Sequence, residues 1–160
     1  MTAREPARCG WAGTAATMIE YHDTEWGFPV GDDRHLFEKM CLEGFQSGLS
    51  WSTILNKRAA FRRAFADFDI EKVARFGAKH VDRMLADASI VRHRGKIAST
   101  INNAQRALEL IDEFGSIATF LDRFVPAPQP APTGLVKTHL IRPGGGDLHH
   151  VLGELVHRAR

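Results

Sequence analysis

The sequence predicts an all-α fold, a compact bundle of short helices followed by an irregular tail rich in proline and glycine. Apolar residues recur every three or four positions along several segments, which is the spacing of one helix face. No segment shows the sustained alternation of apolar and polar residues that is typical of a strand. The helical pattern stops near residue 124. We therefore expect a helical domain over residues 1–124 and a divergent tail over residues 125–160.

The composition is that of a globular protein of one domain. A chain of 160 residues can bury a sizeable core, and ten phenylalanines against one tyrosine predict an aromatic interior. The net charge of +2 is too small to indicate a polyanionic partner by itself. Two cysteines do not make a disulfide framework. Because no apolar run resembles a signal peptide or a bilayer span, we expect a cytoplasmic protein without a membrane partner. We also expect a monomer.

The first third of the chain is predicted to contain one short segment and one helix. Residues 1–8 are polar, and a short segment then ends in the motif at residues 21–27. Asp32 or Asp33 can cap the following helix, because a short carboxylate accepts hydrogen bonds from the free N–H groups of a first turn. That helix should end within residues 44–48, where two glycines occur.

The middle of the chain contains the clearest helical pattern. Apolar side chains at Ile97, Ile101, Ala104, Leu108 and Ile111 are spaced 4, 3, 4 and 3 residues apart. The basic segment before them, residues 89–96, is too short and too basic for a core element. The remaining expected elements are a helix capped by Ser50, a turn at residues 67–69, a short helix from Ile70, a helix over residues 78–86, an end of the long helix at Gly115, and a last helix from Ser116 to Phe124.

The tail differs in composition from the rest of the chain. Four alternating prolines within residues 126–132 predict a stiff linker. A run of three glycines and a short His-rich helical pattern over residues 148–156 follow. We interpret the tail as a weak appendage to the helical domain.

Glu43 is the acidic residue in the most unusual position. Leu36, Met40 and Glu43 stand at i, i+4 and i+7, so they share one helix face, and the carboxylate is expected near the core or in a pocket wall. An unpaired buried carboxylate costs several kcal/mol. The alternatives are that Glu43 pairs with an arginine or a lysine elsewhere, or that the helix is rotated and the carboxylate is solvated.

A basic turn is expected between the two helices that precede residue 115. No acidic residue lies between Asp87 and Glu109. The free N–H groups and the dipole of a helix start favour an anion, and Gly95 would let the backbone approach a phosphate. Such contacts would hold a duplex without reading its sequence. The alternative is a solvated basic turn. The cationic residues of this stretch are Arg92, Arg94, Lys96 and Arg106.

Four motifs in order and spacing resemble one family. They are RCGW at residues 8–11, YHDTEWG at 21–27, LFEKMCLEGFQSGLSW at 36–51 and IVRHRGKI at 90–97. Together they resemble the DNA-3-methyladenine glycosylase I family, within the helix-hairpin-helix superfamily of base-excision repair enzymes. The resemblance covers residues 8–124. It implies a monofunctional enzyme that hydrolyses the N-glycosidic bond of 3-methyladenine in double-stranded alkylated DNA and leaves an abasic site.

The resemblance also implies roles for particular residues. Glu43 matches the base-contacting, catalytic glutamate, and aromatic residues line the same pocket. Without the motifs, each lone aromatic would be interpreted as core filling. The implied base-binding residues are Tyr21, Trp51 and Trp11, and the implied DNA-backbone contacts are Arg92, Arg94, Gly95 and Lys96.

The family's structural zinc is expected to have only half of its ligands here. Cys9 and His22 match the first pair of ligands, but no cysteine follows Cys41, so the family's Cys₂His₂ site is not completed in the same way. Histidines of the tail are the remaining candidates. They are His149, His150 and His157.

A second departure concerns the basic turn, where the family has a glycine and this chain has Ser89. If that position needs a positive φ, a residue with a Cβ would be strained there. The departures leave a second hypothesis from another class: a catalytically inactive helix-hairpin-helix protein that binds DNA without cleaving the base.

Overall fold

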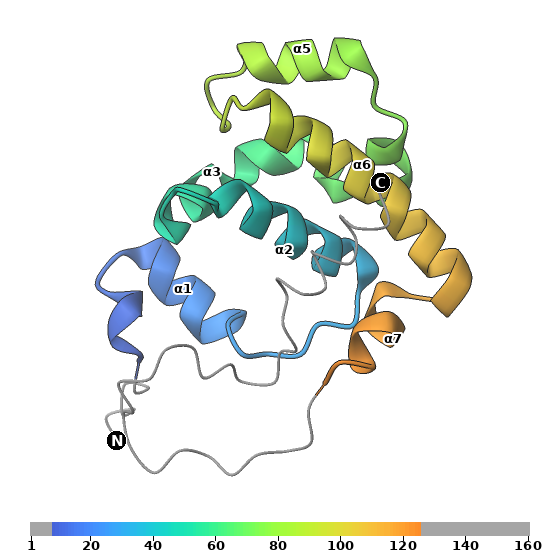
Figure 1. Ribbon diagram of the computed structural model, residues 1–160. Helices are drawn as coiled ribbons and strands as arrows, with labels where there is room; N and C mark the ends of the chain where they lie inside the picture. Colours follow the sequence, from blue (N-terminus) through green and yellow to red (C-terminus); the bar gives the residue numbers. More distant parts are fainter. Residues whose placement is uncertain (1–7, 126–160) are drawn as a thin grey trace.

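The computed structural model describes residues 8–125, and within that range its regular elements are all helices, without a strand (Figure 1). This confirms the all-α prediction for the helical part. The predicted tail lies outside the described residues. The elements are η1 (Gly10–Ala12), α1 (Ala16–Thr24), α2 (Asp33–Gln46), α3 (Trp51–Ala64), η2 (Ala66–Phe68), α4 (Ile70–Ala74), α5 (Ala78–Ala86), α6 (Arg94–Phe114) and α7 (Ile117–Asp122), where η marks a 3₁₀-helix.

Three helices begin at the capping residues expected from the sequence. The Asp32 carboxylate accepts from the backbone N–H of His35 at 2.8 Å, at the start of α2. Ser50 and Ser116 cap α3 and α7 in the same way, each through its hydroxyl oxygen. Each cap satisfies a donor that a helix leaves free in its first turn, which is worth about 1 kcal/mol.

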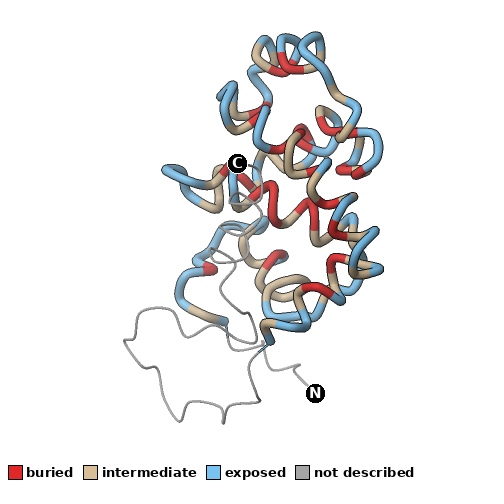
Figure 2. The backbone as a smooth tube through the Cα atoms, turned by 45° about the vertical axis from the view of Figure 1, so that its right-hand side comes forward, coloured by how far each residue is buried: buried red, intermediate tan, exposed pale blue. Residues whose placement is uncertain are grey.

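Helix α2 is the central element of the bundle. It packs against α3, α6 and α7, and Figure 1 shows it crossing the middle of the molecule. Figure 2 shows that buried positions gather where the helices meet, while the outer sides of the same helices are exposed. Full burial of one phenylalanine contributes about 1.5–3 kcal/mol. The fully buried phenylalanines are Phe37, Phe45, Phe61, Phe65 and Phe68.

The turn expected at residues 67–69 is a left-handed 3₁₀ turn. Ala66, Asp67 and Phe68 have φ values of 51°, 54° and 55°. Left-handed backbone costs about 1–2 kcal/mol for each residue with a Cβ. The ring of Phe68, fully buried between Phe37 and Phe65, offsets this cost. The handedness of the turn therefore depends on core packing and was not predictable from the local sequence.

The basic turn between α5 and α6 differs from the sequence prediction in two respects. The long helix begins at Arg94 rather than near Ile97, so Gly95 lies in its first turn. Ile90 is only 3% exposed and belongs to the core, although the shortness and the basic character of the segment predict no core element there. The turn is thus anchored to the bundle by an apolar side chain.

The strain expected at Ser89 is absent. Among the non-glycine residues within 8–125, positive φ occurs only in the η2 turn, so Ser89 has ordinary backbone geometry. Its N–H and its hydroxyl group both donate to the Asp87 carboxylate, at 2.8 Å and 2.6 Å. The turn is therefore held by side-chain hydrogen bonds rather than by a left-handed residue.

The long helix α6 ends at Gly115, whose φ of +83° allows the chain to leave the helix. Helix α7 is then tied to the start of α2, because the Asp33 carboxylate accepts from the N–H of Ile117 at 2.8 Å. In the part of the chain that the structure describes, no helix has the length and apolar character needed to cross a bilayer.

Candidate active site

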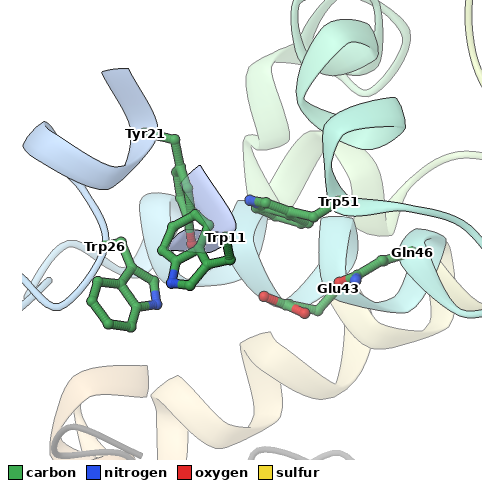
Figure 3. Close-up of a pocket in the computed structure, with 6 residues that line it drawn as sticks. All are labelled: Trp11, Tyr21, Trp26, Glu43, Gln46 and Trp51. Carbon is green, nitrogen blue, oxygen red and sulfur yellow. The ribbon is translucent and has the colours of Figure 1, made fainter. Parts of the chain in front are cut away.

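A pocket of about 200 Å³ lies between α1, the start of α3 and the end of α2. Pockets for drug-sized molecules commonly measure about 300–1,000 Å³, so this one suits a single planar ring system. Figure 3 shows aromatic rings around the pocket and the Glu43 carboxylate directed toward them. The sequence contains three tryptophans and one tyrosine, and all four line the pocket. The lining residues are Trp11, Tyr21, Trp26, Glu43, Gln46 and Trp51.

The four aromatic rings form a continuous cluster from three segments of the chain. The ring centroids of Tyr21 and Trp51 are 5.3 Å apart, and those of Trp11 and Trp26 are 5.2 Å apart. Trp11 joins the two pairs, since its ring centroid lies 6.3 Å from that of Tyr21. Tyr21 is 7% exposed whereas Trp11 is 42% exposed. The pocket therefore has a buried inner wall and an accessible outer wall.

Glu43 lies in the wall of this pocket, where its helix position predicted it. Glu43 is half-buried, and its negative charge affects the pKa of the neighbouring Tyr21 phenol. Burial, then the charges of Glu43 and Glu25, raise the pKa of Tyr21 to about 12, against a smaller opposing effect of Arg58. The Tyr21 side chain thus remains a neutral phenol at neutral pH.

Among the described residues, the most deeply buried carboxylate is not Glu43 but Glu38, on the opposite side of α2. It is 6% exposed and accepts hydrogen bonds from Arg58 Nε at 2.7 Å and from Arg62 Nε at 2.8 Å. Burial raises the pKa of Glu38, but these hydrogen bonds and the charges of the two arginines together outweigh that effect and hold the pKa below its ordinary value. The sequence could have indicated the burial of Glu38, because Glu38, Leu42 and Phe45 also share one helix face.

Three residues at the site were not identified from the sequence. Trp26 lines the pocket, although the sequence favoured core filling for it, and Gln46 lies one helical turn after Glu43. Trp26 belongs to the YHDTEWG motif, which could have indicated its role. Lys39 lies behind the pocket, where its Nζ donates to the Tyr21 hydroxyl oxygen at 2.5 Å. Its contact depends on two helices meeting, so no local pattern could have indicated it.

The predicted DNA-backbone residues lie together at the start of α6. Arg92 is exposed, and Arg94 pairs with Asp82 at 3.1 Å. Lys96 makes its hydrogen bonds within the protein. Its Nζ donates to the backbone oxygens of Phe45 at 2.8 Å and of Ser47 at 2.5 Å. These are carbonyls at the end of α2, the helix that carries Glu43. The turn and the pocket are thereby connected directly.

Gly95 has a specific packing role in the same turn. A Cβ at this position would lie 3.1 Å from Cε1 of His93, which is a very close contact. His93 cannot move freely, because its Nδ1 accepts from the N–H of Lys96 and caps the helix. The absence of a side chain at Gly95 therefore leaves room for the His93 ring that caps α6.

The predicted zinc ligands Cys9 and His22 lie next to each other. The Cys9 N–H donates to Nε2 of His22 at 3.2 Å, and Nδ1 of His22 lies 2.9 Å from the Asp23 carboxylate. No group of three or more potential metal ligands occurs within residues 8–125. A metal bound at Cys9 and His22 would therefore need further ligands from outside that range. Cys41, by contrast, is a buried core thiol whose pKa is raised by burial.

The family model of the methyladenine glycosylases matches residues 11–140. The chain belongs to this family. The match continues past Val125, so the resemblance extends further than the sequence motifs indicated. The chain is 46% identical over 118 residues to DNA-3-methyladenine glycosylase 1 of Escherichia coli, and 42% identical over 118 residues to the DNA-3-methyladenine glycosylase of Haemophilus influenzae. Each alignment covers 74% of this chain but only 63% and 64% of these relatives.

Solved structures of methyladenine glycosylases have the same fold. A crystal structure of 3-methyladenine DNA glycosylase I matches with a TM-score of 0.82 at 38% identity, over 95% of this chain and 82% of that one. A tyrosine-to-phenylalanine variant in complex with 3-methyladenine matches with a TM-score of 0.71 at 38% identity, over 73% and 63% of the two chains. A glutamate-to-glutamine variant of the Staphylococcus aureus enzyme has a TM-score of 0.70 at 38% identity, over the same shares of the two chains.

Proposed function

We propose that this protein is a DNA glycosylase that removes 3-methyladenine from alkylated DNA. The observation that carries the proposal is the pocket that the chain's only tyrosine and all three tryptophans line together with Glu43. Family membership and the likeness to a glycosylase solved with 3-methyladenine support it.

The residue types of the pocket suit a cationic base. Methylation at N3 makes the adenine of a nucleotide cationic, and aromatic faces attract a cation through their quadrupoles. The Glu43 carboxylate adds charge attraction and can accept a hydrogen bond from the exocyclic amine. The base must leave the duplex to reach such a pocket, and a damaged base loses less stacking and pairing when it does so. The pocket therefore favours the alkylated base over normal adenine.

The reaction requires little acid catalysis from the protein. When the bond between C1′ and N9 breaks, its electron pair moves to the base, which departs as a neutral molecule. A water molecule adds to C1′ and loses a proton, which leaves an abasic site. Glu43 contributes by binding and orienting the base. Lys96 is held on the carbonyls at the end of α2, which supports a hydrolytic, monofunctional reaction over one through a lysine adduct.

We propose that α5, the basic turn and α6 form a helix-hairpin-helix element that holds double-stranded DNA. The exposed guanidinium group of Arg92 and the exposed backbone of Gly95 in the first turn of α6 suit a phosphate. Arg94 is placed to add charge there, although it pairs with Asp82 on α5. Because Lys96 connects the turn to α2, DNA bound at the turn would lie against the element that carries Glu43.

Zinc binding, a monomeric state and a cytoplasmic location stay predictions from the sequence. Cys9 and His22 would hold the zinc from the side of the aromatic cluster, where the His22 ring lies 5.2 Å from that of Trp11. Metal analysis of the purified full chain tests this. We expect any zinc that the full chain binds to be lost in a Cys9→Ala variant, and a metal content unaffected by this substitution would contradict the role of Cys9.

The proposed activity is tested by incubating the full chain with alkylated duplex DNA and measuring release of free 3-methyladenine. We expect release by the unmodified protein, a sharp loss in Glu43→Gln, and no change in Glu20→Gln, which alters an exposed carboxylate of α1. DNA binding without release would overturn the proposal and favour the inactive DNA-binding protein. Equal release by both variants would show that the Glu43 carboxylate is not needed for the reaction.

A further inference from the structure

Lys39 places a positive charge directly behind two walls of the pocket. It stands on α2 four residues before Glu43, so both side chains project from the same side of the helix. Its Nζ lies 4.2 Å from the centre of the Tyr21 ring and 5.4 Å from that of Trp51, and it donates to the Tyr21 hydroxyl oxygen. A half-buried lysine behind a site for a cationic ligand is unexpected, because like charges repel.

We propose that Lys39 is a positioning and specificity-determining residue of the pocket, which fixes the Tyr21 hydroxyl group as a hydrogen-bond donor and weakens the preference for a cationic over a neutral base. This inference rests on the proposed function, since it concerns the selection of the base that the pocket binds.

The donor role of the Tyr21 hydroxyl group follows from the hydrogen-bonding capacity of Lys39 and Tyr21. An ammonium group has three donors and no acceptor, so the Tyr21 oxygen must accept from Lys39. The phenol's own hydrogen is then available to another acceptor. Because Tyr21 lines the pocket, a ring nitrogen of a bound adenine base is the acceptor that this arrangement suits. Tyr21 remains protonated at neutral pH, since its pKa is raised to about 12.

The weaker preference for a cationic base follows from the charges around the pocket. Glu43 attracts a cationic base, whereas Lys39 repels it from behind Tyr21 and Trp51. The charges of Glu25, Glu38 and Arg58 also affect the pKa of Lys39. Two unit charges about 8 Å apart at an effective dielectric constant of about 40 interact by about 1 kcal/mol, roughly fivefold in affinity. A neutral base carries no net charge, so Lys39 does not repel it in this way. Lys39 therefore reduces discrimination between the two kinds of base.

The test compares a matched pair of ligands that differ by one methyl group and one charge. The neutral ligand is 9-methyladenine, and the cationic one is 3,9-dimethyladeninium, in which the methyl group at N9 replaces the sugar. Calorimetric titration of the full chain gives the affinity for each. We expect Lys39→Met to increase the ratio of cationic to neutral affinity by roughly three- to tenfold, and Lys39→Arg, which keeps the charge, to leave the ratio nearly unchanged. Thermal unfolding verifies that both variants are folded.

The donor role is tested by a double-mutant cycle with Tyr21→Phe. If Lys39 orients the hydroxyl group, Tyr21→Phe weakens binding of the neutral base in the unmodified protein and has little further effect in the Lys39→Met background. An unchanged affinity ratio in Lys39→Met, or equal effects of Tyr21→Phe in both backgrounds, would overturn the corresponding part of the inference. Failure of the unmodified protein to bind either base would instead overturn the proposed function, and with it the role of Lys39.

Discussion

The Arg58 guanidinium group donates to the buried Glu38 carboxylate at 2.7 Å and also donates to Glu25 at 2.5 Å. Arg58 lies on α3, Glu38 lies on α2, and Glu25 immediately precedes the pocket residue Trp26. This one side chain therefore fastens the segment that carries an aromatic wall to the two helices that carry Glu43 and Trp51.

Glu38→Gln should destabilise the fold, because it removes the charge that compensates two arginines. Loss of one partner of a buried ion pair costs about 3–5 kcal/mol, and we expect the lower part of that range since Arg58 keeps Glu25. Urea denaturation at neutral pH measures the free energy of unfolding. Glu71→Gln is the matched control: its pair with Arg75 is exposed and should contribute less than about 0.5 kcal/mol. Equal effects of the two substitutions would contradict this account.

The same carboxylate predicts a loss of stability in acid. The pKa of Glu38 in the folded protein lies below its ordinary value of 4.5, so the unfolded chain binds this proton first as the pH falls. The stabilisation from Glu38 is present above about pH 4.5 and is lost as the pH falls toward the folded-state pKa. Unfolding free energies measured between pH 6 and 3 should decline less steeply in Glu38→Gln. Parallel curves for the two proteins would show that Glu38 is not responsible.

The contrast between capping residues and charged partners shows what the sequence could predict. Asp32, Ser50 and Ser116 act on N–H groups three residues away, so the local sequence was sufficient to place them. The partners of Glu38 and Lys39 come from other helices, 18 to 24 residues away. Such contacts depend on how helices pack, which periodicity does not determine.

The pocket itself was predicted only in part, and mostly through motifs. Glu43 was found from helix periodicity as well as from the family resemblance, whereas Tyr21, Trp11 and Trp51 came from the resemblance alone. Their rings meet because α1 packs against α3 and η1 packs against α1. Trp26 was missed because a lone tryptophan in a small helical protein is usually core filling.

Lys96→Met and Arg92→Gln should affect different properties. Lys96→Met should lower stability, whereas Arg92→Gln should change DNA binding. Lys96 caps the carbonyl end of α2, so its loss should lower stability by about 1.5 kcal/mol, as expected for hydrogen bonds from a charged group. Arg92 is exposed, so its loss should leave stability unchanged and reduce the salt dependence of duplex binding by about one phosphate contact. Thermal unfolding and binding titrations at several salt concentrations measure both effects. A reduced salt dependence in folded Lys96→Met would show that Lys96 also reaches a phosphate.

Tyr21 can be titrated directly, because it is the only tyrosine of the chain. Burial and the charges of Glu43 and Glu25 should place the midpoint of tyrosinate absorbance near pH 12 in the folded protein, against about 10 in denaturant. Since the unfolded chain loses this proton first, stability should fall as the pH rises from about 10 to 12. Glu43→Gln should lower the midpoint. A folded-state midpoint near 10 would contradict the buried position of the phenol.

The central claim is that the aromatic pocket binds the alkylated base with the help of Glu43. All three tryptophans line that pocket, so intrinsic fluorescence reports on it without a label. Titration of the full chain with free 3-methyladenine should give a saturable change in tryptophan emission. Affinity should fall by about tenfold or more in Glu43→Gln, because a hydrogen bond to a charged group is lost, and should be unchanged in Glu20→Gln. The absence of a saturable change, or equal affinity in all three proteins, would contradict the claim.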